Sequence, residues 1–218
     1  MHIRLSHWKV MENKYLTREY IWAKMVIAIS RRIITEGGEI MVLETKRLLL
    51  REMKADDFQA LFLVLGDPET MWHYPFTFDG QHVRDWIERN INRYRKDGFG
   101  LWAVCLKETG ELIGDCGLTL QNIRGEMLPE IGYHIRRDCQ RKGYASEAAE
   151  GVRNWAFRNT AYPILYSYCK YTNVPSIKTA ESIGMRFVCE YPDETNGTTH
   201  VSAISREEWL NEITGGKV

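Results

Sequence analysis

A glycine set directly before a helix, among basic side chains, is the feature of this sequence that points most clearly to chemistry. Gly143 follows Gln140, Arg141 and Lys142 and precedes a helix predicted over residues 144–159. Free backbone N–H groups at a helix N-terminus form an anion site, and glycine lets a phosphate approach the backbone closely. Phosphate binding is one interpretation of this segment. A solvated turn between a strand and a helix is the other.

The elements that position this loop have the pattern of one mixed domain. A strand leads into the loop, and the helix after it leads to a further strand. Hairpins flank this unit, and Asn196-Gly197 marks the turn of the last one. The pattern predicts an α/β (mixed α+β) fold, with a mostly antiparallel sheet flanked by helices. About seven strands are expected, over residues 48–50, 101–107, 112–118, 130–135, 164–169, 186–190 and 199–204.

Residues 1–40 differ from the rest, because their apolar and charged residues do not sort onto two faces of an element. A short accessory helix over residues 20–34 is one interpretation. The other is a native start at Met41, because the preceding Glu-Gly-Gly-Glu is what a bacterial ribosome-binding site would encode if translated. Both interpretations place an N-terminal extension at residues 1–40 and the domain at residues 41–218.

The composition disfavours several classes of partner. Lys and Arg number 29, as do Asp and Glu, so the net charge is zero, and a dedicated nucleic-acid-binding protein would carry a basic excess. Five scattered cysteines without a C-x-x-C pair indicate reduced thiols and no zinc site. The apolar stretch Met25–Ile29 is far shorter than the ~20 residues of a membrane span. We expect a cytoplasmic protein with no metal, membrane or nucleic-acid partner.

Several motifs in order carry a family resemblance. Gln140-x-x-Gly143-x-Ala145 resembles the Q/R-x-x-G-x-G/A loop that binds the acetyl-CoA pyrophosphate in the GNAT superfamily. The chain is similar to the RimJ/RimL (ribosomal-protein N-acetyltransferase) branch from about Leu43 to Trp209. The segments that carry this likeness are 44–51, 114–117, 130–133, 173–176, 183–185 and 206–209.

The resemblance implies a GNAT fold whose sheet is splayed between its fourth and fifth strands, 130–135 and 164–169. Acetyl-CoA would lie in this opening, with its pantetheine arm paired to the fourth strand like an added strand. The cofactor-binding residues that the resemblance implies are Ile135, Gln140, Arg141, Lys142, Gly143, Tyr144, Ala145, Asn173 and Ser176.

The resemblance also implies direct attack of an amine on the thioester, without a cysteine nucleophile. Glu130 matches the family's fourth-strand glutamate and would accept the amine proton, although a purely structural carboxylate is the other interpretation. Ser202 stands where many relatives have a tyrosine that protonates the departing thiolate. The role of general acid is therefore open among Ser202, Tyr168 and Tyr191.

The acceptor is expected to be a protein or peptide N-terminal α-amine, by resemblance to the RimJ/RimL branch. A small-molecule amine and a non-catalytic acyl-CoA-binding module are the alternatives. Trp72 and Tyr74 lie in the loop 71–76, which would wall the acceptor channel, although core packing explains Trp72 and Phe76 equally well. Lone histidines such as His134 have no metal-ligand spacing. Both a monomer and a homodimer are compatible with the sequence.

Overall fold

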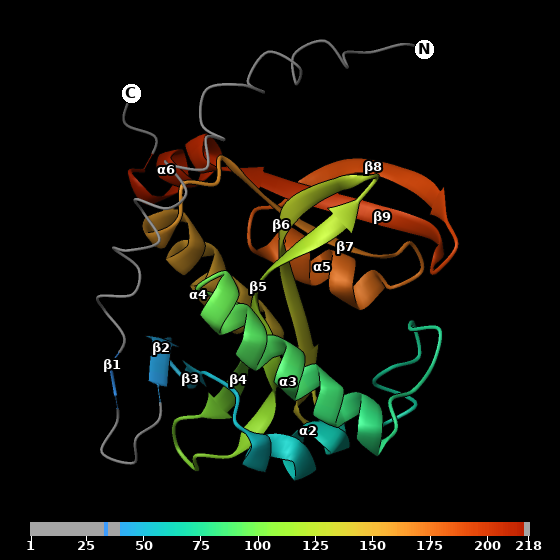
Figure 1. Cartoon of the computed structure of the whole chain (residues 1–218). Coiled ribbons are helices and arrows are strands. Elements are labelled where there is room, and N and C mark those ends of the chain that lie inside the picture. The colour runs from blue at the N-terminus through green and yellow to red at the C-terminus, as the bar shows by residue number, and fades with distance from the viewer. Residues whose placement is uncertain (1–32, 35–39, 216–218) are drawn as a thin grey trace.

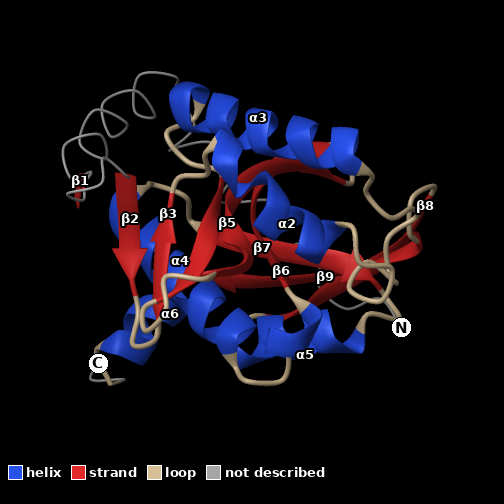
Figure 2. Cartoon of the chain, turned by 90° about the horizontal axis from the view of Figure 1, so that it is seen from below, coloured by secondary structure: helices blue, strands red, loops and turns tan. Residues whose placement is uncertain are grey.

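The computed structural model describes residues 33–34 and 40–215, which form a nine-stranded sheet with helices on both faces (Figures 1 and 2). The strand order is β1-β2-β3-β4-β5-β6-β7-β9-β8. The strands are β1 (Ile33–Ile34), β2 (Ile40–Glu44), β3 (Leu48–Arg51), β4 (Leu101–Leu106), β5 (Leu112–Ile123), β6 (Glu126–Ile135), β7 (Ile164–Lys170), β8 (Arg186–Asp193) and β9 (Gly197–Ser205).

Helices form the two outer layers. In Figure 2, α2 and α3 cover one face of the sheet, and α4, α5 and α6 cover the other. The helices are α2 (Phe58–Leu65), α3 (Gly80–Lys96), α4 (Tyr144–Asn159), α5 (Val174–Ser182) and α6 (Arg206–Ile213). The mixed α/β fold expected from the sequence is confirmed, and α4 has the bounds that the apolar spacing predicts.

The sheet opens between β6 and β7, as the family resemblance implies. β6 pairs with β5 along its whole length, from Glu126 opposite Ile123 to Ile135 opposite Gly114. Its parallel pairing with β7 is limited to Glu130 opposite Tyr166. Because β7 continues along β9 as far as Lys170, the two parallel strands diverge beyond Glu130. One edge of β6 is therefore left facing a V-shaped opening.

The sheet has more strands than the expected seven. β2 pairs with β3, and β1 pairs with β2, so the described sheet begins before residue 41. Ile33–Ile34 form a strand, which contradicts the end of the expected helix over 20–34. The other residues of the 1–40 extension lie outside the described part of the chain, apart from Ile40. The β5–β6 hairpin is also longer than expected, because Arg124 and Gly125, both with positive φ, make its turn.

α3 lies across β4, β5 and β6, beside the opening. It begins at an N-cap, Asp79, whose carboxylate accepts hydrogen bonds from the backbone N–H groups of Gln81 and His82. Its buried stripe consists of Val83, Ile87, Asn90 and Tyr94. Asn90 is a polar residue in this stripe and is fully buried, so its side chain needs hydrogen-bond partners. These hydrogen bonds set the helix in one position.

Candidate active site

The loop before α4 has the backbone of an anion-binding turn. Arg141 and Gly143 both have positive φ, 60° and 80°. Gly143 is the N-cap of α4, and no side chain caps this end. The Nε2 of Gln140 donates to the carbonyl oxygen of Ile135 (2.9 Å), which ties the loop back to the end of β6. The first N–H groups of α4 therefore have no intrahelical or side-chain acceptor and can receive an anion.

A second contact holds this loop from the β2–β3 turn. Arg47 Nε bonds Glu147 Oε2 (2.6 Å), and its Nη1 donates to the Lys142 carbonyl oxygen (2.9 Å). The guanidinium of Arg47 also lies over the Tyr144 ring, 4.4 Å from its centroid. Thr45 Oγ1 donates to Glu147 Oε1 (2.6 Å). Sequence reasoning assigned no role to Arg47 or Glu147, because only the fold brings the β2–β3 turn against α4.

Glu130 is a buried carboxyl beside the opening. Its side chain is 7% exposed and accepts a hydrogen bond from Thr119 Oγ1 (2.9 Å). The carboxylate lies over Gly132, because a Cβ built on that glycine would meet Oε2 at 3.1 Å. Burial raises the pKa of Glu130 to about 7, although the Thr119 hydrogen bond and the charges of His134 and Arg93 act to lower it. A carboxyl with this pKa can accept a proton at neutral pH.

A hydrogen-bonded chain lies next to Glu130 under α3. Asp115 is fully buried, and its two oxygens contact His134 Nδ1 (2.7 Å) and Trp86 Nε1 (2.8 Å). The other ring nitrogen of His134 is 2.6 Å from the Tyr74 hydroxyl. Burial lowers the pKa of His134, but the Asp115 charge and hydrogen bond raise it by more. His134 thus anchors the loop that carries Tyr74.

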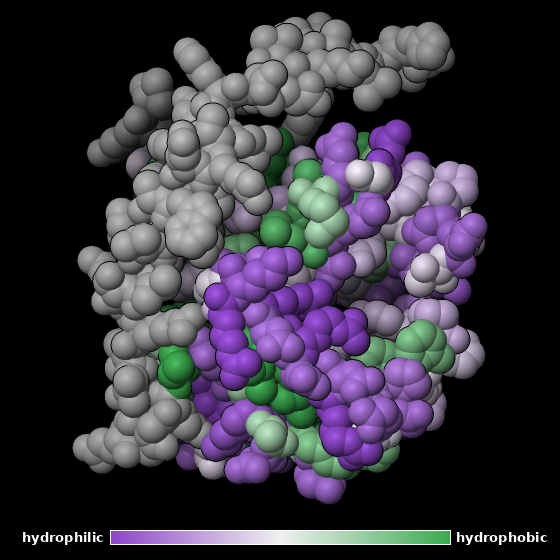
Figure 3. All heavy atoms as spheres, viewed as in Figure 1, coloured by the Kyte–Doolittle hydropathy of each residue, from purple (hydrophilic) through white to green (hydrophobic). Residues whose placement is uncertain are grey.

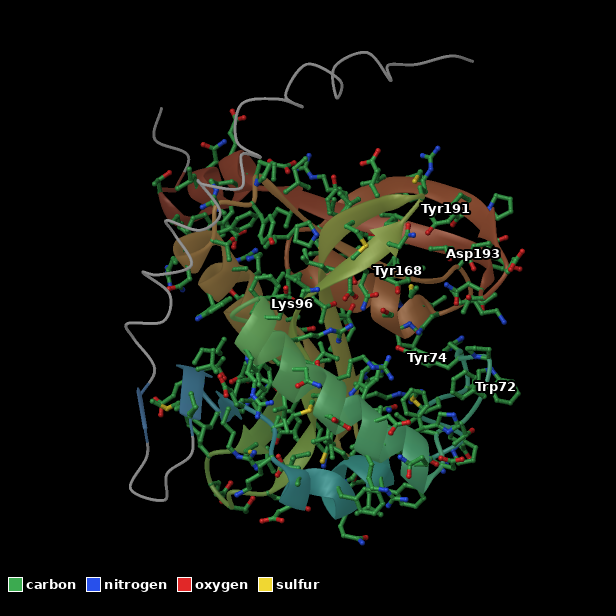
Figure 4. All side chains as sticks on the ribbon, viewed as in Figure 1. Trp72, Tyr74, Lys96, Tyr168, Tyr191 and Asp193 are labelled. Carbon is green, nitrogen blue, oxygen red and sulfur yellow. The ribbon has the colours of Figure 1, made fainter. Side chains whose placement is uncertain are left out.

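The two expected acceptor residues differ in their contacts. Tyr74 is 42% exposed but points its hydroxyl to His134, and the burial of this hydroxyl raises the pKa of the phenol. Trp72 is 77% exposed and Phe76 is 51% exposed, so the core-packing alternative for these two side chains is wrong. Figure 4 shows Trp72 and Tyr74 on the loop after α2, on the same side of the molecule as Tyr168 and Tyr191. In the space-filling view of this side, the surface is hollowed between α3 and the β7–β9 region (Figure 3).

Strand pairing decides which side chains face Glu130. Paired residues of neighbouring strands share a face, so Tyr166, opposite Glu130, points to the α3 side. Tyr168, two residues further along β7, points to the same side. Burial raises the pKa of the Tyr168 phenol, and the Glu130 charge adds to this effect. Glu130 and Tyr168 are therefore brought together on one face.

Ser202 lies on the opposite face of the sheet. It pairs with Ser167 of β7, whose side chain points away from that of Tyr168. Ser202 is 2% exposed, and its hydroxyl is 3.2 Å from Nε2 of His200. The Nδ1 of His200 is in turn 3.1 Å from Oε1 of Glu190. The structure thus does not bring Ser202 together with Glu130.

The second expected cofactor segment lies beside the opening, on the α5 side. Asn173 is the N-cap of α5, and its Oδ1 accepts from the backbone N–H of Ser176 (3.2 Å). The Tyr133 hydroxyl of β6 donates to the Ser176 carbonyl oxygen (2.8 Å). The start of α5 is therefore fixed to β6 across the gap.

Other sites are not indicated within the described residues. There, no group of three or more His, Cys, Asp or Glu side chains is arranged to hold a metal ion. None of the helices in that same part of the chain has the length and apolar character needed to cross a membrane. Cys105, Cys116 and Cys139 are buried, whereas Cys169 and Cys189 are partly exposed.

Comparison with known families decides the class of protein. A sequence profile described as an acetyltransferase (GNAT) domain matches residues 47–186. The chain belongs to the GNAT acetyltransferase family. The matched residues of this GNAT chain include Glu130, the loop before α4 and the start of α5. They end at Arg186, the first residue of β8, so Ser202 lies outside them.

Relatives of this GNAT chain are similar over most of their own length. The uncharacterized protein YkkB of Bacillus subtilis (strain 168) is 34% identical over 146 residues, which are 66% of this chain and 85% of the relative. The uncharacterized N-acetyltransferase YnaD of the same organism is 31% identical over 146 residues, 67% of this chain and 83% of the relative. The GNAT chain is accordingly an N-acetyltransferase, and the alternative of a non-catalytic binding module is set aside.

A solved structure with the same fold is RimL, named as the ribosomal L7/L12 alpha-N-protein acetyltransferase. The match has a TM-score of 0.66 and covers 80% of this chain and 99% of RimL, at 15% identity. A second RimL structure is a complex with coenzyme A and matches with a TM-score of 0.63 at 16% identity. The GNAT family uses acetyl-CoA, and the uncapped start of α4 in this chain fits its anionic pyrophosphate.

Proposed function

We propose that this enzyme transfers an acetyl group from acetyl-CoA to a primary α-amine, at the N-terminus of a protein or peptide. The observation that carries the proposal is a buried carboxyl where β6 and β7 separate, Glu130, whose burial raises its pKa to about 7. A protonated α-amine has a pKa of ~7.7–8.0, so its proton passes to Glu130 at small cost. A lysine side chain has a pKa of ~10.4, which makes the same transfer unfavourable by roughly 4–5 kcal/mol. The fold shared with RimL supports the same acceptor class.

In this proposal, two segments of the chain bind acetyl-CoA. The loop 140–145 receives the pyrophosphate, because the left-handed Arg141 and Gly143 let neighbouring N–H groups converge on one anion. Arg141 and Lys142 add positive charge beside it. Ile135, at the end of β6, together with Asn173 and Ser176 at the start of α5, borders the route to the opening.

Two residues beside the opening have different roles in the acetyl transfer. The amine nitrogen bonds to the acetyl carbon, the carbon–sulfur bond breaks, and the thiolate leaves with the electron pair. Glu130 accepts the proton of the α-ammonium group and so supplies the neutral amine, and the second proton, lost as the amide forms, passes to the departing thiolate. Tyr168 stays protonated, since burial raises the pKa of its phenol, and donates a hydrogen bond to the departing sulfur. We assign this role to Tyr168 rather than Ser202, because Tyr168 shares the face of Glu130.

Tyr168→Phe is expected to lower kcat about five- to tenfold. The effect is modest because a thiolate with a pKa of ~8.5 leaves well without full protonation. The Ser202 hydroxyl lies on the other face of the sheet, hydrogen-bonded to His200. Ser202→Ala is therefore expected to change kcat less than twofold. Thiol release at saturating substrates measures both. A larger loss in Ser202→Ala than in Tyr168→Phe would reverse the assignment.

A panel of amines tests the proposed function. Thiol release is measured with acetyl-CoA and peptides of differing N-terminal residues, with N-terminally blocked peptides that contain lysine, and with polyamines and aminoglycosides. Free peptide N-termini are expected to react fastest, and mass spectrometry is expected to place the acetyl group on the α-nitrogen. Faster turnover of a small amine would favour the alternative of a small-molecule acetyltransferase. No thiol release with any amine would overturn the proposal.

A further inference from the structure

Arg93 is a half-buried cation on α3 that lacks a matching carboxylate. Its Nη1 donates one hydrogen bond, to Oδ1 of Asn90 (3.2 Å). Within the residues that the structure describes, no Asp or Glu forms an ion pair with it. A guanidinium has five N–H donors in a planar fork that suits a carboxylate. Most of the donors of Arg93 are therefore unused by the protein.

The spacing along α3 places Arg93 at the level of Glu130. Trp86, Asn90 and Arg93 form one stripe, at i, i+4 and i+7. Trp86 packs edge-on against His134 of β6, with ring centroids 5.7 Å apart. Asn90 is fixed by bonds to the Leu101 N–H (3.0 Å) and the Trp86 carbonyl oxygen (2.9 Å). Leu101 pairs with Gly117, which pairs with Gly132 of β6, so Asn90 lies at the level of Gly132. Arg93, about one turn further along α3, therefore continues the stripe from His134 towards Glu130.

Electrostatics agree with this placement. Burial and the neighbouring Arg89 lower the pKa of Arg93, whereas the charges of Glu130, Asp97 and Tyr168 act to raise it. The same attraction acts on Glu130, whose pKa the Arg93 charge lowers. A partly desolvated charge without a hydrogen-bonded counter-ion costs free energy, and such groups gather at binding sites. Arg93 thus presents open donors on the face that Glu130 and Tyr168 share.

We propose that Arg93 binds a carboxylate of the acceptor, so that the preferred substrate is a primary amine that carries a carboxylate close by. The inference rests on the proposed function, because it concerns the acceptor side of the same site. Two sources supply this chemistry. One is the side chain of Asp or Glu at a peptide N-terminus, and the other is the α-carboxylate of a free amino acid. In either case the guanidinium fork would orient the amine towards Glu130.

Matched pairs of acceptors test the inference. Peptides that begin with Asp or Glu are compared with peptides that begin with Asn or Gln, and free amino acids with their amides. The wild-type enzyme is expected to favour the carboxylate member of at least one pair about tenfold or more in kcat/KM. In Arg93→Gln this ratio is expected to fall to about one. Arg93→Lys, which keeps the charge but not the fork, is expected to retain part of the preference.

Arg95→Gln is the matched control. Arg95 also donates to an asparagine three residues earlier, Asn92 (3.3 Å), but its side chain is exposed. The control is expected to keep the wild-type carboxylate preference. If the wild-type enzyme gave a kcat/KM ratio near one for both pairs of acceptors, the inference would be overturned. Turnover of these acceptors would still support the proposed function. A carboxylate preference that remains in Arg93→Gln would show that another residue binds the carboxylate. A complete lack of turnover would end both proposals.

Discussion

Glu130→Gln is expected to lower kcat about a hundredfold between pH 7 and pH 8. General-base assistance contributes on the order of 10²–10⁴-fold, and glutamine keeps the size of the side chain and an acceptor for the Thr119 hydroxyl without accepting a proton. Glutamine also removes a charge beside Arg93, so acetyl-CoA KM is measured in parallel. An unchanged acetyl-CoA KM with reduced kcat would locate the loss in the transfer step rather than in cofactor binding.

The pH dependence of this loss follows from two ionisations. The base acts where Glu130 is ionised, above about pH 7, and where the amine is still protonated. For an α-amine with a pKa of ~7.7–8.0 the ratio of wild-type to variant kcat therefore peaks between pH 7 and pH 8. It falls below pH 7, because the wild-type Glu130 becomes protonated, and above pH 8, because the amine is already neutral. A peak that extends towards pH 10 would instead indicate a lysine side chain.

The free energy of unfolding is a second quantity that Glu130→Gln is expected to change. The pKa of Glu130 is raised in the folded state, so the folded protein binds more protons than the unfolded chain between about pH 4.5 and pH 7. Glu130 therefore lowers stability as the pH rises through this range. Glu130→Gln lacks this cost and is expected to exceed the wild-type free energy of unfolding by roughly 1–3 kcal/mol at pH 8, but not at pH 5. Urea denaturation at both pH values measures the difference.

Glu126→Gln is the control for both measurements. Glu126 lies on the same strand and the same face as Glu130 but is exposed, so neither kcat nor the pH dependence of stability is expected to change. Wild-type kcat at every pH in Glu130→Gln would leave Glu130 with a structural role only. The ionisation of the amine would then govern the rate by itself.

Local patterns predicted the parts of the site that depend on neighbouring residues in the chain. The strand–loop–helix unit around Gly143 needs only the strand before it, the turn residues and the apolar spacing of α4. The parallel direction of β6 and β7 follows from the same unit, since a crossover helix joins the two strands, whereas the opening between them was expected only from the family resemblance. The strand–loop–helix unit was confirmed because its determinants are local.

Properties that depend on distant segments could not be predicted in the same way. The face of Ser202 is set by the register of β9 on β7, and a slip of one residue would reverse it. The raised pKa of Glu130 depends on burial in the folded protein, which the sequence does not show. With the ordinary pKa of a carboxyl, the largest loss of kcat in Glu130→Gln would be expected at acidic pH. Arg93 has no motif around it. Only its helical phase relative to Trp86 and Asn90, once α3 is placed on the sheet, indicates that it faces the site.

Gly143→Val is expected to raise the KM for acetyl-CoA tenfold to a hundredfold with the fold intact. Gly143 has a φ of 80°, which valine disfavours, so the loop would shift towards negative φ and turn its N–H groups away from the pyrophosphate. Space is not the main obstacle, because a Cβ there would meet only the Nη2 of Arg47, at 3.4 Å. The effect should appear in the binding of acetyl-CoA, measured by calorimetry and steady-state kinetics.

Gly110→Val separates this effect from backbone strain. Gly110 lies in the turn between β4 and β5 with a φ of 74°, and a Cβ there would have no atom within 4 Å. The two valine variants should therefore lose similar stability, of about 1–2 kcal/mol, through the same unfavourable backbone conformation. Because no hydrogen bond or ion pair within the described part of the chain joins residues 108–111 to residues 140–145, only Gly143→Val should weaken the binding of acetyl-CoA. Equal acetyl-CoA affinity in the two folded variants would show that the loop 140–145 does not bind the pyrophosphate. A loss confined to Gly143→Val would tie binding to the conformation of that one residue, since the strain would be common to both.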